Sequence, residues 1–122
     1  MADNERKIAG VSQQELERRW KLARDHLRER GIDAMIAVST EAPNNSGYTR
    51  WFTDAAGAYR NVVVFHANDL MTVVEHGFHG TRRETGGKDP THPGVGEILN
   101  VAEFPAVNYN QRYEADAIVA ML

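Results

Sequence analysis

The first side chains in this chain that could do chemistry are histidines and a carboxylate. They gather in the segment 75–79 (Glu-His-Gly-Phe-His), and His66 and His92 lie in neighbouring segments. Imidazole and carboxylate can bind zinc or iron, but such a site needs further ligands and supporting hydrogen bonds. Gly77 and the end of an expected strand argue against one helical face carrying both His76 and His79. We therefore predict solvated or hydrogen-bonded loop histidines, and no metal site in this chain.

A pair of arginines, Arg82 and Arg83, lies in a glycine-rich stretch. A guanidinium can hold a carboxylate through two parallel hydrogen bonds, so a carboxylate ligand is one interpretation. The other is a pair of surface arginines, one of which forms an ion pair with Glu84 or Asp89. The sequence leaves both interpretations open.

Aromatic side chains are concentrated at Tyr48, Trp51, Phe52 and Tyr59. Aromatic residues are most often core residues, but a loop that carries several of them often lines an interface. We predict that Tyr48, Trp51 and Phe52 contribute to an interface.

Several classes of function are disfavoured by composition. The chain has no cysteine, and neither Ser39 nor Ser46 lies in a Gly-x-Ser-x-Gly turn, so no catalytic nucleophile is predicted. The glycines do not have phosphate-loop spacing. A net charge of -3 argues against a nucleic-acid partner. No apolar run approaches the roughly 20 residues of a membrane span, so we expect a soluble, cytoplasmic protein.

The elements that must position these side chains begin with a helix. Ser12 and Glu15 form a capping-box pattern, and apolar residues then recur at spacings of three and four until Gly31 supplies a helix stop. The apolar residues are Leu16, Trp20, Ala23 and Leu27. We interpret residues 1–11 as a flexible leader and residues 12–122 as one domain.

The remaining chain predicts a mixed α/β order. The expected elements are a buried strand at 32–38, an antiparallel hairpin of 61–65 and 70–74, a long surface loop at 76–96 with a short helix near Arg82 and Arg83, a strand at 98–101, and a helix at 112–122 with Ala115, Ile118, Val119 and Leu122 on its apolar face. The order favours a mixed β-sheet with helices packed on it.

Several segments together resemble the amino-terminal domain of the creatinase/prolidase family of metallohydrolases. They are Arg19-Trp20, the run from Leu27 to Ile36 with its Gly-Ile-Asp-Ala sequence, Asn45-Ser-Gly-Tyr48 followed by Phe52, the run from Gly57 to Phe65, and Glu75-His-Gly followed by Thr81-Arg-Arg83. The resemblance covers about residues 15–120. Two departures from the family pattern are the absence of a glycine after Tyr48 and the alanines that flank Gly57.

The resemblance implies a ribonuclease-H-like fold, a mixed β-sheet flanked by helices. It also implies a following catalytic domain, absent from this chain, in which two Asp, one His and two Glu bind a dinuclear divalent metal centre. The parent would be an Xaa-Pro dipeptidase or aminopeptidase, with amidinohydrolases and lyases as other family activities.

The role that the resemblance implies for this chain is non-catalytic. It would build a homodimer and gate a small peptide or carboxylate substrate held on the catalytic domain. The implied gating residues are Tyr59, Arg60, Arg82 and Arg83. The alternative is a free-standing module that self-associates or binds a small ligand without enzymatic activity.

Overall fold

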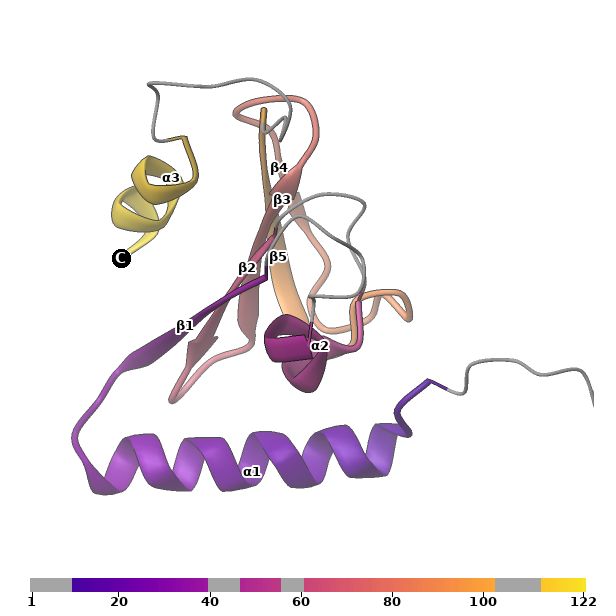
Figure 1. Cartoon of the computed structure of the whole chain (residues 1–122), viewed down its shortest axis with the longest axis vertical. Coiled ribbons are helices and arrows are strands. Elements are labelled where there is room, and N and C mark those ends of the chain that lie inside the picture. Colours follow the sequence, from indigo (N-terminus) through magenta and orange to yellow (C-terminus); the bar gives the residue numbers. More distant parts are fainter. Residues whose placement is uncertain (1–9, 40–46, 56–60, 103–112) are drawn as a thin grey trace, which may run out of the picture.

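The computed structural model describes residues 10–39, 47–55, 61–102 and 113–122. Its elements, in chain order, are α1 (Gln13–Glu29), β1 (Ala34–Val38), α2 (Gly47–Thr53), β2 (Val62–His66), β3 (Met71–His76), β4 (Arg82–Glu84), β5 (Val95–Val101) and α3 (Tyr113–Met121). The fold is thus mixed α/β, with a five-stranded sheet and three helices in the described ranges (Figure 1).

The sheet has the strand order β1-β2-β3-β5-β4. Neighbouring strands are antiparallel except β3 and β5, which are parallel. The register shifts between Met71 and Thr72, where β5 carries an extra residue opposite β3. This topology leaves β1 and β4 as the two edge strands.

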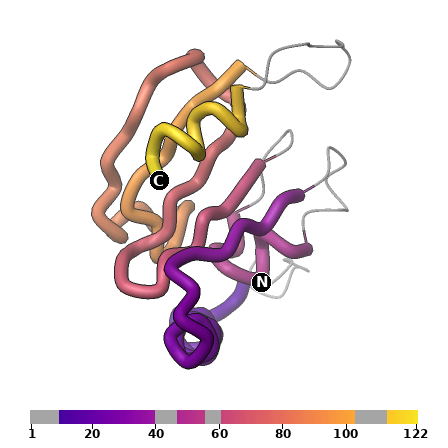
Figure 2. The backbone as a smooth tube through the Cα atoms, turned by 90° about the vertical axis from the view of Figure 1, so that its left-hand side faces the viewer, coloured from indigo at the N-terminus to yellow at the C-terminus, as the bar shows by residue number. Residues whose placement is uncertain are grey.

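Helices lie on both faces of the sheet, α1 and α2 on one face and α3 on the other (Figures 1 and 2). Alternating side chains of the strands therefore form two separate cores. The core beneath α1 and α2 comprises Leu16, Trp20, Ala23, Leu27, Phe52, Val63, Phe65, Ala67, Met71, Val73, Val95 and Ile98. The smaller core beneath α3 comprises Val62, Val64, Val74, Val101 and Ile118.

The predicted start and stop of α1 are confirmed. The Ser12 side chain accepts a hydrogen bond from the Glu15 N–H at 3.1 Å. Gly31 has φ +65°, and the Ile32 N–H donates to the Leu27 carbonyl at 2.9 Å. This bond, together with that from the Gly31 N–H to the Arg28 carbonyl, closes the helix as a Schellman motif. The predicted hairpin is confirmed as β2 and β3.

Two predictions about local structure are wrong. Residues 76–96 are not one long loop, because β4 pairs with β5 within them, and Arg82 and Arg83 lie on that strand rather than on a short helix. Residues 47–53 form the helix α2, which the aromatic run did not reveal. Both elements are short, and their stability comes from packing on the sheet rather than from local propensity.

Two predictions about burial are also wrong. Strand β1 is not buried, because it lies at an edge of the sheet and most of its side chains reach solvent. In the predicted helix at 112–122, Ile118 is buried, but Ala115 and Val119 of α3 and Leu122 after it are exposed, while Tyr113, Ala117 and Met121 pack against the core. Among the described residues, no helix is both long and apolar enough to cross a membrane.

Candidate functional site

The two candidate gating arginines on β4 point to opposite faces of the sheet. Arg82 is opposite Leu99 in the register and shares the face of α3, whereas Arg83 is opposite Ile98, a core residue beneath α1. Successive residues of a strand alternate between faces, so the two guanidiniums cannot bind one ligand together. The structure therefore separates them into two sites.

The other sequence-predicted site residues lie apart from these arginines. Tyr59 and Arg60 lie outside the described residues. On α2, Tyr48 is 77% exposed, while Phe52 is buried and packs on Phe65 at a centroid distance of 5.0 Å. Trp51 is half-buried, with its ring edge-to-face on Phe52. Of the three predicted interface aromatics, Tyr48 is the one that presents most of its surface to solvent.

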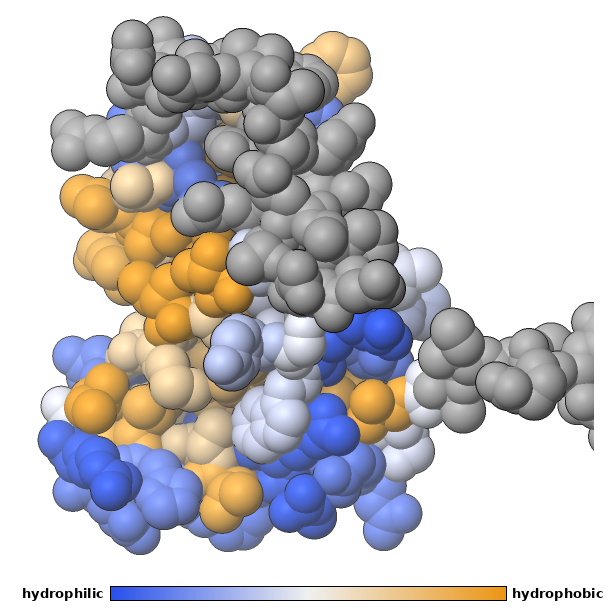
Figure 3. Space-filling view, in the orientation of Figure 1, coloured by the Kyte–Doolittle hydropathy of each residue, from blue (hydrophilic) through white to orange (hydrophobic). Residues whose placement is uncertain are grey.

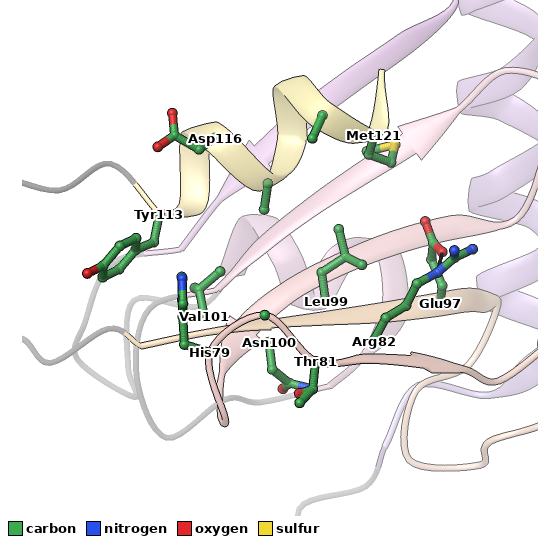
Figure 4. Close-up of a pocket in the computed structure, with 13 residues that line it drawn as sticks. His79, Thr81, Arg82, Glu97, Leu99, Asn100, Val101, Tyr113, Asp116 and Met121 are labelled. Carbon is green, nitrogen blue, oxygen red and sulfur yellow. Dashed lines mark hydrogen bonds and ion pairs between the residues drawn. The ribbon is translucent and has the colours of Figure 1, made fainter.

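Arg82 borders a groove of about 820 Å³ between α3 and the β4–β5 edge (Figure 4). The polar side chains that line it are His79, Thr81, Arg82, Glu97, Asn100, Tyr113 and Asp116, and the apolar ones are Leu99, Val101, Ala117, Ala120 and Met121. The volume is within the range of small-molecule sites. Helix α3 packs on the sheet through buried Ile118 and partly buried Tyr113, Ala117 and Met121, and the groove lies on the β4–β5 side of this contact.

A row of hydrogen-bonded polar side chains crosses the sheet on this face, with one member from each of four strands. Arg82 Nε donates to Glu97 Oε2 at 2.5 Å, and Thr72 Oγ1 donates to Glu97 Oε1 at 3.3 Å. His66 Nε2 lies 3.1 Å from Thr72 Oγ1. Because the single hydroxyl hydrogen of Thr72 goes to Glu97, His66 Nε2 must be the donor in that contact.

The positive charge of Arg82 at the groove is neutralised by neighbouring carboxylates. The Arg82 guanidinium pairs with Glu97 and also with Glu84, whose Oε1 lies 3.1 Å from Arg82 Nη2. The Arg82 charge is therefore already balanced by carboxylates, so an incoming carboxylate ligand would have to displace one of them. A hollow of about 440 Å³ continues from the groove beyond Arg82, past His66 and Thr72.

Arg83 belongs to a second charged cluster on the opposite face. Its Nη1 lies 3.1 Å from Asp89 Oδ2, and Asp89 Oδ2 lies 3.4 Å from His92 Nδ1. His92 Nε2 reaches the Glu75 carboxylate at 3.3 Å. The hydrogen bond to Glu75 raises the pKa of His92, with the nearby charges of Glu75 and Asp89 acting in the same direction against burial and Arg83. Hydrogen bonds from Thr91, followed by that from Arg83, hold the pKa of Asp89 below its usual range.

The histidines considered as metal ligands are not brought together. His92 contacts Glu75, whereas His79 packs its ring on Tyr113 at a centroid distance of 4.1 Å, at the groove on the other face. Within residues 10–39, 47–55, 61–102 and 113–122, no group of three His, Cys, Asp or Glu side chains is arranged to hold a metal ion.

Sequence reasoning missed Glu97 and Thr72, which organise the polar row. A signal for Glu97 was present, since it is the one charged residue in the strand Val95–Val101. Nothing in the sequence indicated that Thr72 and His66 would be its neighbours, because that depends on the parallel pairing of β3 with β5.

Comparison with protein-family models found no match to this chain, and a search of curated proteins found none either. The function must therefore be inferred from the residues and the geometry described above.

Proposed function

We propose that this chain is the non-catalytic amino-terminal domain of a creatinase/prolidase-type metallohydrolase, of the Xaa-Pro dipeptidase or aminopeptidase type, with a ribonuclease-H-like fold. The observation that carries the proposal is the placement of the motif segments. The helix that Gly31 ends is followed by β1, and Tyr48 and Phe52 lie on the next helix, α2. The β2–β3 hairpin then pairs with β1 in a sheet that has helices on both faces. These segments resemble the family in order, and they occupy consecutive elements of one α/β unit.

The catalytic chemistry would lie in a following domain with a dinuclear divalent metal centre. Val119 on α3 and Leu122 directly after the helix are exposed, and they would offer such a domain an apolar surface. Figure 3 shows apolar side chains gathered over α3 and extending toward β1.

For substrate gating, Arg82 is the stronger of the two candidate arginines. It borders a groove of small-molecule size, whereas Arg83 holds Asp89 in a cluster on the other face. A substrate carboxylate would replace Glu97 or Glu84 as the ion-pair partner of Arg82. The guanidinium would then remain paired with a carboxylate both before and after the ligand binds. Tyr59 and Arg60 stay in the proposal on their sequence positions alone.

The test uses the complete parent protein and hydrolysis of Xaa-Pro dipeptides with added divalent metal. Truncation of Arg82 to Ala should raise KM by about tenfold or more, because a hydrogen bond to a charged group contributes roughly 1.5–3 kcal/mol. Metal content should stay unchanged. Arg83→Ala and Arg83→Glu are the matched comparison, and we expect a smaller rise in KM for them. Unchanged KM in all three variants would contradict gating, and a parent without metal-dependent hydrolysis would contradict the family proposal.

A second candidate function is a free-standing, self-associating module without enzymatic activity. The uncharged, apolar edge of β1 favours it. A coding sequence that stops after Leu122 would support this function, and one that continues with Asp, Asp, His, Glu and Glu ligands would support the hydrolase.

A further inference from the structure

Within the part of the chain that the structure describes, strand β1 has a free edge with a regular set of unpaired backbone groups. The Ala67 N–H donates to the Asp33 carbonyl at 2.9 Å, and the Ser39 N–H donates to the Asn61 carbonyl at 3.0 Å. In an antiparallel pair, residues alternate between those bonded to the neighbour and those whose N–H and C=O point away. The backbone groups of Ala34, Ile36 and Val38 therefore point away from β2, and no described strand pairs with them.

The two edges of the sheet differ in the features that prevent strand pairing. Edge strands are normally short or carry charged side chains. Strand β4 has both features, since it consists of only three residues, Arg82–Glu84, and all three are charged. Strand β1 has five residues, Ala-Met-Ile-Ala-Val, and no charge. Its side chains are exposed by 38% at Met35, 49% at Ile36 and 40% at Val38. Nothing in β1 itself opposes the addition of another strand.

We propose that β1 pairs antiparallel with β1 of a second copy of this chain, about a two-fold axis at Ile36, and so joins the two sheets into one. In this register Ile36 is opposite Ile36, and Ala34 is opposite Val38 of the other copy. Every outward N–H and C=O of these residues then has a partner on the second strand. The inference gives an interface to the dimerisation that the proposed function assigns to this domain.

Charge and side-chain type are compatible with this register. Asp33 falls opposite Ser39, so no like charges face each other across the axis. The Ile36 side chains meet on the face that carries α3, where Ala34 already packs against the smaller core. Helix α3 lies over β3 and β5, so none of the described helices covers the β1 side of this face. A symmetric contact of this kind closes on itself and gives a dimer rather than a fibre.

The first experiment is sedimentation equilibrium of the 122-residue chain. The unmodified chain should be a dimer, and both Ile36→Lys and Ile36→Pro should be monomeric. Proline at 36 removes an N–H that faces away from β2, so it leaves the β1–β2 bonds in place. Val119→Lys, which changes an exposed apolar residue on α3, should remain dimeric. A monomeric unmodified chain, or a dimer that survives both Ile36 changes, overturns the proposal.

The second experiment remains decisive if the Ile36 variants fold poorly. The chain has no cysteine, so a single Ile36→Cys change gives one thiol per copy. Hydrogen-bonded antiparallel partners have Cα atoms about 5.5 Å apart, within the roughly 4.4–6.8 Å that a disulfide spans. Ile36→Cys should form a covalent dimer in mild oxidant much faster than Met35→Cys. In the proposed register, the two thiols at position 36 are directly opposite each other, whereas the two residues at position 35 are offset along the strands. Equal rates for the two variants overturn the register. Neither experiment depends on metal-dependent hydrolysis, so failure of this pairing is distinguishable from failure of the hydrolase proposal.

Discussion

His92 is held between two carboxylates, Glu75 and Asp89, in the cluster that also contains Arg83. The hydrogen bond to Glu75 is the main reason why the pKa of His92 is raised. A histidine with a raised folded-state pKa binds its proton more tightly in the folded chain than in the unfolded chain, so the proton stabilises the fold. This contribution is complete below the unfolded pKa of about 6.5 and is lost as pH rises through the folded-state pKa.

We predict that His92→Asn destabilises the chain more at acidic than at alkaline pH. The measurement is the free energy of unfolding in urea at about pH 5.5 and about pH 8.5, on either side of the ordinary histidine pKa. The difference between the unmodified chain and the variant should shrink as pH rises. Gln14→Asn, a change at an exposed position on α1 that carries no titratable group, is the control and should not show this trend. An equal loss at both pH values would show that the Glu75 contact acts without the charge on His92.

At the scale of elements, the residues just before β5, Pro93 and Gly94, contact both α1 and α2 near Trp20. Trp20 Nε1 donates to the Phe52 carbonyl at 2.5 Å, and Thr53 Oγ1 donates to the Pro93 carbonyl at 2.7 Å. Gly94 then passes so close to the indole that a Cβ on Gly94 would lie 2.5 Å from Trp20 Cζ2. Gly94 also has φ +73°, a conformation that costs little only for glycine.

We predict that Gly94→Ala lowers the free energy of unfolding by roughly 2–4 kcal/mol, because it adds overpacking to left-handed backbone strain. Gly80→Ala is the matched control, since Gly80 has φ +83° but open space around the position of a Cβ. It should cost about 1–2 kcal/mol from backbone strain alone. Urea unfolding of both variants measures the difference, and equal losses would rule out the contact with Trp20 as the cause.

At the scale of the whole molecule, the sheet formed by the described strands has one protected edge and one open edge. Three consecutive charged residues occupy β4, and five uncharged residues occupy β1. The open edge lies on the opposite side of the sheet from the groove bordered by Arg82, so assembly through β1 leaves that groove accessible.

We predict that the thermal midpoint of the unmodified chain rises with protein concentration, because mass action favours a folded dimer over unfolded monomers. Ile36→Lys should have a midpoint that does not depend on concentration. Leu22→Lys, an exposed apolar position on α1, should keep the dependence. Calorimetry over about two decades of protein concentration makes the comparison. A constant midpoint in all three proteins would be evidence for a monomer.

The sequence by itself determined α1, its two ends and the β2–β3 hairpin. These features depend on interactions within a few residues, namely the Ser12 cap, the left-handed Gly31 and the turn formers Asn68 and Asp69. It also indicated a mixed α/β class, because the order of apolar segments survives errors at single boundaries. The resemblance to creatinase/prolidase domains remains a prediction from the sequence.

Only the tertiary structure decided which faces these elements present. Arg82 and Arg83 are neighbours in sequence, but the pairing of β4 with β5 sends them to different clusters. The apolar strand predicted at 32–38 was expected to be buried, yet the observed strand β1 is exposed because it lies at the sheet edge. Strand pairing and burial depend on residues that are far apart in the chain, so local propensity does not predict them. The groove, the polar row and the open edge could therefore be identified only from the arrangement of the strands in the sheet.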